Sequence, residues 1–293
     1  MKVAFVGTGR MGQAMANRLL AAGHDLAAYN RTAEKTRALA AAGAKVLRSI
    51  AEAACYGEAV FTMLADDAAL DDVAYQTGGL LQSLPAGGIH LCAGTHSVGI
   101  IQKLEAAHAA AGQILLHTPM LGRPELVVSG QAGIVVGGPK ESADRCRPLF
   151  EAIARRVFEA GPHPVSAAAI KIANNFVLGC AIEAMGEGFA LVRKYGVVPQ
   201  VFYDVMTDGL FAASAYKVYG KLIAEERYLP AGQRAILGLK DANLALAAGE
   251  AAGVPLPSGN VWRDRLVGAL AHGEGEHDWA VMAKEQARAS GLA

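Results

Sequence analysis

Short apolar runs alternate with alanine-rich stretches through the first part of the chain. The apolar runs predict β-strands at residues 3–6, 25–29, 45–47, 60–64, 89–92, 114–116 and 133–137. Two intervening stretches, 11–22 and 32–42, have the three- and four-residue apolar spacing of helices, and Thr32 is placed to cap the second. Strands separated by helical segments predict an α/β fold with a mostly parallel sheet.

The pattern changes at Gly161-Pro162-His163-Pro164, where two closely spaced prolines predict a break. From 165 to 194 the apolar spacing is helical, and no proline interrupts it. Further helices are expected at 200–206, 213–225, 235–252 and 261–271, and no strand is expected after residue 165. We therefore predict an α/β domain at 1–163 and an all-helical domain at 164–293, which opens with the long interdomain helix.

Composition is consistent with well-packed domains and limits the possible partners. Hydrophobic residues make up 53% of the 293 positions and charged residues 18%, which excludes disorder as the main description. The 27 basic side chains equal the 27 acidic ones, and the pI is near 7.1. A neutral chain has no general attraction for nucleic acid or an anionic membrane, so we expect a small-molecule substrate recognised by local charge.

The cysteines and the N-terminus are typical of a cytoplasmic protein. The four thiols, Cys55, Cys92, Cys146 and Cys180, form no C-x-x-C pair and have no histidine cluster beside them. We expect reduced, packed thiols and no metal site. The opening apolar run is too short for a signal peptide, and no stretch approaches about 18 uncharged apolar residues, so no transmembrane helix is expected.

The first candidate site is the run Gly7-Thr8-Gly9-Arg10-Met11-Gly12, which follows the first predicted strand and opens a helix. This is G-x-G-x-x-G in the context typical of dinucleotide binding, and it predicts a Rossmann-type N-terminal domain. Gly7 would permit the tight turn, Gly9 the approach of a pyrophosphate, and Gly12 the packing of helix on strand. The N–H groups that open the helix would bind the phosphates. A glycine-rich turn without a ligand is the alternative.

The end of the second predicted strand bears on the choice of cofactor. An NAD enzyme usually has Asp or Glu about 20 residues after the glycines, to bind the ribose 2′-hydroxyl. Here Asn30 occupies that position, followed by Arg31 and Thr32. Asparagine does not repel a 2′-phosphate, arginine can pair with it, and threonine can donate a hydrogen bond. We expect NADP(H) rather than NAD(H); a merely solvated Arg31 is the alternative.

With these motifs the chain resembles the β-hydroxyacid dehydrogenases, the family that includes 3-hydroxyisobutyrate dehydrogenase and glyoxylate/succinic semialdehyde reductase. Residues 6–16 resemble its signature G-x-G-x-M-G-x-x-M-A, and residues 30–32 resemble the NADP-selecting version. The resemblance extends over nearly the whole chain. It implies a Rossmann-type domain, an all-helical domain and oxidation or reduction of a small hydroxy acid or carbonyl.

The resemblance also assigns residues in two loops after predicted strands. Met63, Leu64 and Ala65 match a loop that runs over the cofactor in the family. Thr95 lies where the family has a Ser-Thr pair near the nicotinamide, and Gly94 replaces the serine. Thr95 is thus expected to contact both cofactor and substrate.

The most specific match is Lys171-Ile172-Ala173-Asn174-Asn175, which resembles the family's K-x-x-x-N. Lys171 and Asn175 are one helical turn apart and share a face. A lysine in an apolar run is costly unless it faces a polar cleft, and partial burial lowers the pKa of an ammonium group. The resemblance implies that Lys171 is the general acid/base and that Asn175 binds the substrate oxygen; a surface lysine is the alternative.

Lys240-Asp241 resembles the family's C-terminal K-D pair. In the family the lysine reaches the cofactor and the substrate, and the aspartate supports the site. Without the resemblance, two such residues in a helix would indicate only a solvated face.

The predicted substrate loop, residues 117–125, departs from the family's D-A-P-V-S-G-G. Leu121 replaces the serine and Arg123 the second glycine, as in a branch with a G-R-P loop, while Gly122 offers only its backbone. Arg123 could bind a substrate carboxylate or form a structural ion pair with Glu125 or another acidic residue. His117 is expected to be structural.

Three functions are consistent with these features. The leading one is an NADP(H)-dependent oxidoreductase of β-hydroxy acids or semialdehyde-type carbonyls. An imine reductase would share the architecture and the N-R-T signature but generally lacks the lysine, and a non-catalytic NADP-binding scaffold or sensor would need none of the polar residues. Small residues at 184–188 suggest close approach of helical domains in a homodimer, or in a tetramer built from it.

Overall fold

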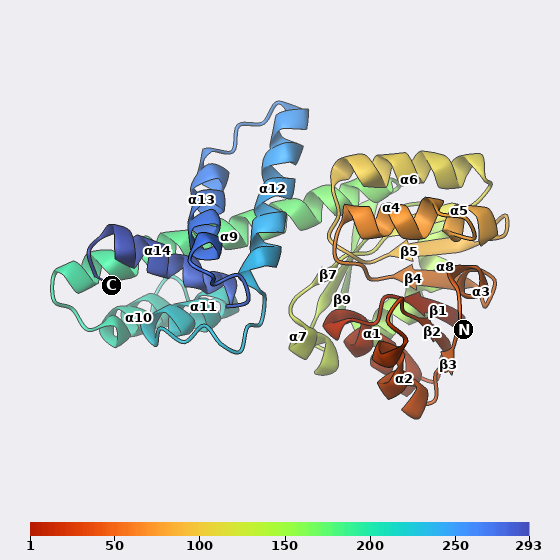
Figure 1. Ribbon diagram of the computed structural model, residues 1–293, viewed down its shortest axis with the longest axis horizontal. Helices are drawn as coiled ribbons and strands as arrows, with labels where there is room; N and C mark the ends of the chain where they lie inside the picture. The colour runs from red at the N-terminus through yellow and green to blue at the C-terminus, as the bar shows by residue number, and fades with distance from the viewer. Residues whose placement is uncertain (293) are drawn as a thin grey trace. The chain divides into compact units, whose positions relative to one another are not determined.

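A nine-stranded sheet organises the first part of the chain (Figure 1). The computed structural model describes residues 1–292, and contacts divide the chain into two units, Met1–Lys171 and a second beginning at Ile172. The strands are β1 Lys2–Val6, β2 Asp25–Tyr29, β3 Lys45–Val46, β4 Ala59–Thr62, β5 Ile89–Cys92, β6 Ile114–His117, β7 Met120–Leu121, β8 Gly133–Gly137 and β9 Arg156–Gly161.

The strand order is β3-β2-β1-β4-β5-β6-β8-β7, with β9 paired to β8. The first six strands pair in parallel, whereas β8 runs antiparallel to β6 and β7. The predicted mostly parallel sheet is confirmed. The order reverses between β1 and β4, and ligands of such sheets bind at the carboxyl ends of the strands at this switch point.

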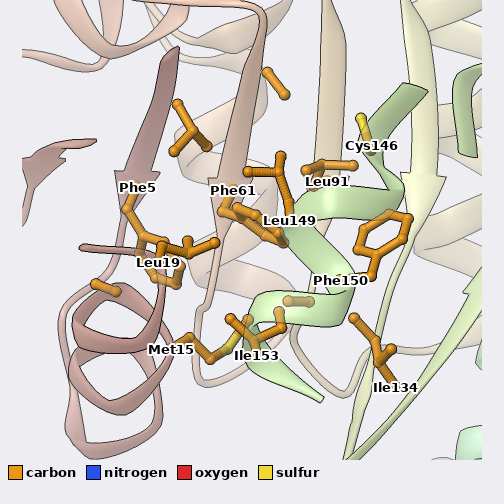
Figure 2. Close-up of a cluster of buried hydrophobic side chains, with 14 of the residues drawn as sticks. Phe5, Met15, Leu19, Phe61, Leu91, Ile134, Cys146, Leu149, Phe150 and Ile153 are labelled. Atoms are coloured by element: carbon orange, nitrogen blue, oxygen red, sulfur yellow. The ribbon is translucent and has the colours of Figure 1, made fainter. Parts of the chain in front are cut away.

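Helices connect the strands. They are α1 Arg10–Ala21, η1 Ala33–Thr36, α2 Arg37–Ala41, α3 Ile50–Ala54, α4 Asp67–Tyr75, α5 Leu80–Ser83, α6 Val98–Ala110, α7 Pro124–Val128 and α8 Lys140–Ile153. Side chains alternate across β1, so Phe5 faces a core formed with α1 and α8, whereas Val6 packs toward α3 and α5. Figure 2 shows the first of these cores, in which Phe5, Phe61 and Leu91 of the strands meet Leu149 and Ile153 of α8.

Four local predictions for the first unit need correction. The strand predicted at 60–64 ends at Thr62, so Met63 and Leu64 lie in the following loop. The helix predicted at 32–42 is a 3₁₀ turn followed by the short α2, and the Thr32 side chain caps neither. The strands β7 and β9 were not expected. All four cysteines are free, but Cys55 is exposed rather than packed.

The second unit is helical. Its elements are α9 Pro164–Lys194, which begins in the first unit, then α10 Pro199–Asp208, α11 Ser214–Ala224, α12 Ala235–Ala252, α13 Pro257–Ala271, η2 Trp279–Val281 and α14 Met282–Ala289. The bounds of α12 agree with the prediction, while α14 was not expected. Trp262 and Trp279 pack edge to face at the centre, 6.1 Å between ring centroids. Gly179 of α9 lies against Trp262, where a Cβ would overlap the indole, so the small residue lets α9 approach α13 closely.

One helix of residues 1–292, α9, is long and apolar enough to cross a membrane by length and composition alone. No such helix was expected, because the prediction required an uncharged run and α9 contains Lys171. Core helices of globular domains meet the same criterion, and α9 carries polar residues such as Asn175 and Glu183 along its length. A single helix of this kind is a weak indication of a membrane span.

Candidate functional site

The glycine-rich turn joins β1 to α1 at the switch point of the sheet. Gly7 has φ +94°, and a Cβ there would overlap the carbonyl oxygen of Met63. A Cβ on Gly12 would overlap the carbonyl oxygen of Gly7. Both positions therefore require glycine, the first for its backbone conformation and the second for the close packing of α1 on the turn.

Gly9 differs from its two neighbours because a Cβ there would meet nothing within 4 Å. Gly9 is also the N-cap of α1, with no side chain bonded to the helix start and no acidic residue in the first turn. An open helix N-terminus without a competing carboxylate fits a phosphate group. The residues of this turn, from Gly7 to Gly12, could hold the pyrophosphate of a dinucleotide.

Asn30, the residue after β2, holds the glycine turn in place through hydrogen bonds. The Thr8 backbone N–H donates to Asn30 Oδ1 at 3.0 Å, and Asn30 Nδ2 donates to the carbonyl oxygen of Thr32 at 2.9 Å. The Thr8 hydroxyl donates to the carbonyl oxygen of Lys35 at 3.0 Å. Asn30 thus has a structural use that the sequence did not reveal: its amide joins the glycine turn to the segment that follows β2.

Arg31, the residue expected to select the cofactor, is exposed, and its side chain has no partner within residues 1–292. Lys35 and Arg37 are also exposed on this segment. The end of β2 therefore presents basic side chains to solvent beside a neutral Asn30. Such basic side chains could pair with a phosphate group on the ribose of a dinucleotide.

The loops after β4 and β5 meet through an aspartate–histidine pair that was not predicted. Asp67 Oδ1 lies 3.0 Å from His96 Nδ1 and also accepts the Ser97 backbone N–H at 3.1 Å. Burial alone would raise the pKa of Asp67, but these bonds from His96 and Ser97 outweigh it and lower the pKa to about 2. Asp67 is therefore a carboxylate, and it anchors the loop that carries Thr95.

His117, the last residue of β6, is fully buried, and its ring lies 6.4 Å from that of His96. Burial, and next the nearby His96, lower the pKa of His117 to about 3, and the charge of Lys171 acts in the same direction. The predicted general acid/base, Lys171, thus lies close enough to the carboxyl end of β6 to act on a group there. His117 is neutral over the physiological range.

The predicted substrate loop folds as β7 and the short α7. Gly122 has φ +125°, a conformation that favours glycine, and Arg123 is the N-cap residue of α7. Arg10 of α1 forms an ion pair with Glu125 at 3.0 Å, so the carboxylate considered as a partner for Arg123 links α7 to α1. Both members of that pair are exposed, so its energetic contribution is small.

Three other predicted residues gather in the second unit. Asn175 Nδ2 donates to Asp241 Oδ2 at 2.8 Å, and Lys240 Nζ lies 3.2 Å from Asp241 Oδ1. Asp241 is only 3% exposed and Asn175 only 7%. A buried carboxylate between an amide and an ammonium group holds the Asn175 side chain in one orientation.

The predicted site residues thus form two groups. One comprises the glycine turn, Arg31, the loops after β4 and β5, the substrate loop and Lys171, all in the first unit. The other comprises Asn175, Lys240 and Asp241, in the second unit. The helix α9 carries Lys171 and Asn175 one turn apart. No group of His, Cys, Asp and Glu side chains within residues 1–292 could hold a metal ion.

Comparison with known proteins supports a dinucleotide-dependent chemistry. Residues 2–161 match the model of the NAD binding domain of 6-phosphogluconate dehydrogenase, and residues 166–285 match the NAD-binding domain of NADP-dependent 3-hydroxyisobutyrate dehydrogenase. The chain is 38% identical over 284 residues to the uncharacterized oxidoreductase YfjR of Bacillus subtilis, covering 97% of this chain and 99% of that one. It is 30% identical to 3-hydroxyisobutyrate dehydrogenase of Pseudomonas aeruginosa, over 94% of each.

Solved structures show the same architecture. The structure of Mycobacterium tuberculosis 3-hydroxyisobutyrate dehydrogenase with L-serine matches with a TM-score of 0.87 and 26% identity, covering 97% of this chain and 98% of that one. An imine reductase from Pseudomonas sp. matches with a TM-score of 0.61 and 21% identity, covering 96% and 98%. The similarity to the imine reductase concerns the fold alone.

Proposed function

Because this chain belongs to the β-hydroxyacid dehydrogenase family of oxidoreductases, we propose that it transfers hydride between NADP(H) and a small β-hydroxy acid or semialdehyde-type carbonyl. The observation that carries the proposal is the pairing on α9. Lys171 acts electrostatically on the end of β6, and one turn later Asn175 is locked by the buried Asp241. The buried amide–carboxylate bond and the lysine near the end of β6 together support a catalytic role for this helix.

Lys171 is the general acid in the direction of reduction. Bound NADPH supplies the hydride, and negative charge then develops on the carbonyl oxygen of the substrate. The Lys171 ammonium group donates its proton to that oxygen and recovers it in the oxidative direction. Asn175 binds the same oxygen with its amide, while Lys240 and Asp241 hold the amide in place. Thr95, Gly122 and Arg123 orient the rest of the substrate.

The Lys171→Ala variant tests this role. We expect kcat to fall by roughly 10²–10⁴-fold, the usual contribution of a general acid, while NADPH binding persists. Steady-state kinetics with 3-hydroxyisobutyrate, succinic semialdehyde and glyoxylate, together with NADPH fluorescence titration, measure both. The matched control is Lys194→Ala, which removes an exposed lysine at the far end of α9. Unchanged turnover in Lys171→Ala contradicts the mechanism.

Arg31 is proposed to select NADP(H) by pairing with the 2′-phosphate. A charge-assisted hydrogen bond contributes about 1.5–3 kcal/mol, so Arg31→Ala should weaken NADPH binding by roughly 10–100-fold and leave NADH binding nearly unchanged. The control, Arg145→Ala, removes an exposed arginine on α8. Equal losses for both dinucleotides in Arg31→Ala would show that Arg31 does not read the phosphate.

An imine reductase is the second candidate, favoured by the substrate loop, where Leu121 supplies no hydroxyl. NADPH oxidation with cyclic imines, compared with short aldehyde acids, separates the two activities. A protein that binds NADPH but reduces neither class would be a scaffold or sensor.

A homodimer in the cytoplasm is also proposed. Residues 184–188 do not support the dimer, because Gly186 packs against Ala283 and Gly188 against Phe202 within the same unit. Several exposed apolar side chains lie instead on α9, on α10 and just after it, among them Val177, Leu191, Val201, Val205 and Leu210. A cavity of about 440 Å³, lined almost wholly by apolar side chains, lies among α9, α10 and α11. Light scattering of the purified protein tests the subunit number.

A further inference from the structure

Asp67 and His96 come from different loops and are joined by a hydrogen bond. Asp67 is the first residue of α4, just after the β4 loop, and His96 follows the end of β5. The His96 side chain is fully buried, whereas that of Asp67 is 34% exposed. Asp67 also accepts the backbone N–H of Ser97, so a single carboxylate holds both the ring and the backbone of the β5 loop. The family comparison assigns neither residue a role.

The His96 ring fills the space beside Gly94. A Cβ at position 94 would overlap His96 Nε2 and would lie 2.9 Å from the carbonyl oxygen of Leu64. No side chain can therefore occupy position 94 while His96 keeps this place. Gly94 and His96 therefore form one steric unit, in which the absence of a side chain at 94 makes room for the ring of 96. This unit lies against the loop after β4, which was predicted to cover the cofactor.

Between these two buried residues, Thr95 is partly exposed. Its position follows from the two neighbours: one has no side chain, and the other is tied to Asp67. We propose that the Asp67–His96 pair is a positioning device, which sets Thr95 and the turn from Gly94 to Ser97 against the reacting end of the cofactor and its substrate. This inference rests on the proposed function.

The Asp67 carboxylate suits this task. Two other groups act on the same region, His117 at 6.4 Å between ring centroids and Lys171 through its charge on His117. A carboxylate directly behind His96 fixes the tautomer and orientation of the ring, as a carboxylate behind a histidine commonly does. An error of about 1 Å in the placement of a substrate-contacting group can cost on the order of 10²-fold in rate.

The first experiment removes the charge and keeps the shape. In Asp67→Asn we expect kcat to fall about 10–100-fold, while the NADPH dissociation constant stays within about twofold of the wild-type value. The matched control is Asp71→Asn on the same helix, which breaks only an exposed ion pair with Lys103 and should leave kcat unchanged. Unchanged kcat in Asp67→Asn overturns the proposal. A parallel loss of kcat, NADPH affinity and melting temperature also overturns it, because the pair would then be merely structural.

The second experiment is a double-mutant cycle on the steric unit. Gly94→Ala alone should lower the melting temperature and weaken NADPH binding, because the new methyl group collides with the ring. Adding His96→Ala should restore part of both losses, since it removes the collision with the ring and leaves only the close contact with the Leu64 carbonyl oxygen. Effects that simply add would overturn the coupling of positions 94 and 96.

The two readouts separate failure of this inference from failure of the proposed function. Melting temperature and NADPH fluorescence need no turnover, so the cycle is informative even if no carbonyl substrate is reduced. If the wild type shows no turnover but the Gly94→Ala and His96→Ala effects are coupled, the proposed reaction is refuted and the contact between positions 94 and 96 is confirmed. If the wild type turns over substrate but the two effects simply add, the proposed reaction stands and the coupling of positions 94 and 96 is refuted.

Discussion

Two buried histidine clusters occupy the first unit, and they differ in what their rings bond to. In the middle of the sheet, His90 of β5 bonds to the Thr62 hydroxyl at 2.8 Å and to His108 of α6 at 3.0 Å. His108 in turn bonds to Gln113 Oε1 at 2.7 Å. Every partner in this chain is neutral. At the end of the same strand, His96 bonds to the carboxylate of Asp67.

The hydrogen-bond partners of the histidines differ in charge between the two clusters. Burial, followed by the neighbouring His108, lowers the pKa of His90 well below its ordinary value, and burial lowers that of His108 against the opposing effect of Gln113. Both rings are therefore neutral parts of the core. The Asp67 carboxylate stays ionised, because its bonds from His96 and Ser97 outweigh burial. His90, in the middle of β5, and His108 of α6 help to fill the core, whereas the role proposed for His96, beyond the carboxyl end of β5, is to build the site.

The largest expected effect comes from breaking the neutral chain. His108→Ala leaves buried hydrogen-bonding groups on His90 and Gln113 without a partner and opens a cavity, which together should cost about 3 kcal/mol. For a unit of this size the melting temperature should fall by roughly 10 °C. Calorimetry measures the shift. Tryptophan fluorescence identifies the transition of the second unit, because both tryptophans, Trp262 and Trp279, lie there.

The control is His163→Ala, which removes an exposed histidine paired with Glu105. It should change the melting temperature by less than about 2 °C, as expected for a surface pair. A similarly small change in His108→Ala would mean that the neutral chain contributes no more to stability than an exposed ion pair.

The same comparison shows which features could be predicted from sequence. The turn from Gly7 to Gly12 and the bounds of α12 depend on residues close together in the chain, and local patterns identify them. Asp67 and His96 are separated by 29 positions and meet only because β4 and β5 are neighbours in the sheet. The available signal was that both lie just beyond predicted strand ends, which meet at one edge of a parallel sheet.

Strand β9 was missed for a different reason. It pairs only with β8, and it carries exposed charged residues such as Arg156 and Glu159. A strand at the edge of a sheet needs no continuous apolar face, so its sequence does not have the pattern of a buried strand. The gathering of Asn175, Lys240 and Asp241 was predictable only through the family resemblance, because no spacing rule brings α9 and α12 together.

The pH dependence of stability gives a smaller effect, which comes from the buried histidines with lowered pKa values. Unfolded histidines have a pKa near 6.5, and His90, His108 and His117 have lower values when folded. Below pH 6.5 the unfolded chain therefore binds more protons than the folded one, and stability falls as the pH decreases. Each ring contributes up to about 1.4 kcal/mol per pH unit, and for His117 the loss continues to about pH 3.

Asp67 titrates in a lower range. Its folded pKa is about 2 against 3.8 for an ordinary aspartate, so its contribution is present above pH 4 and is lost only as the pH falls toward 2. Urea unfolding between pH 7 and 4.5 thus reports the histidines with lowered pKa values and lies above the titration range of the Asp67 carboxylate. His108→Gln keeps an amide between His90 and Gln113 but cannot titrate, so it should reduce the slope by up to about 1.4 kcal/mol per pH unit. An unchanged slope in His108→Gln would show that His108 does not contribute to the loss of stability at lower pH.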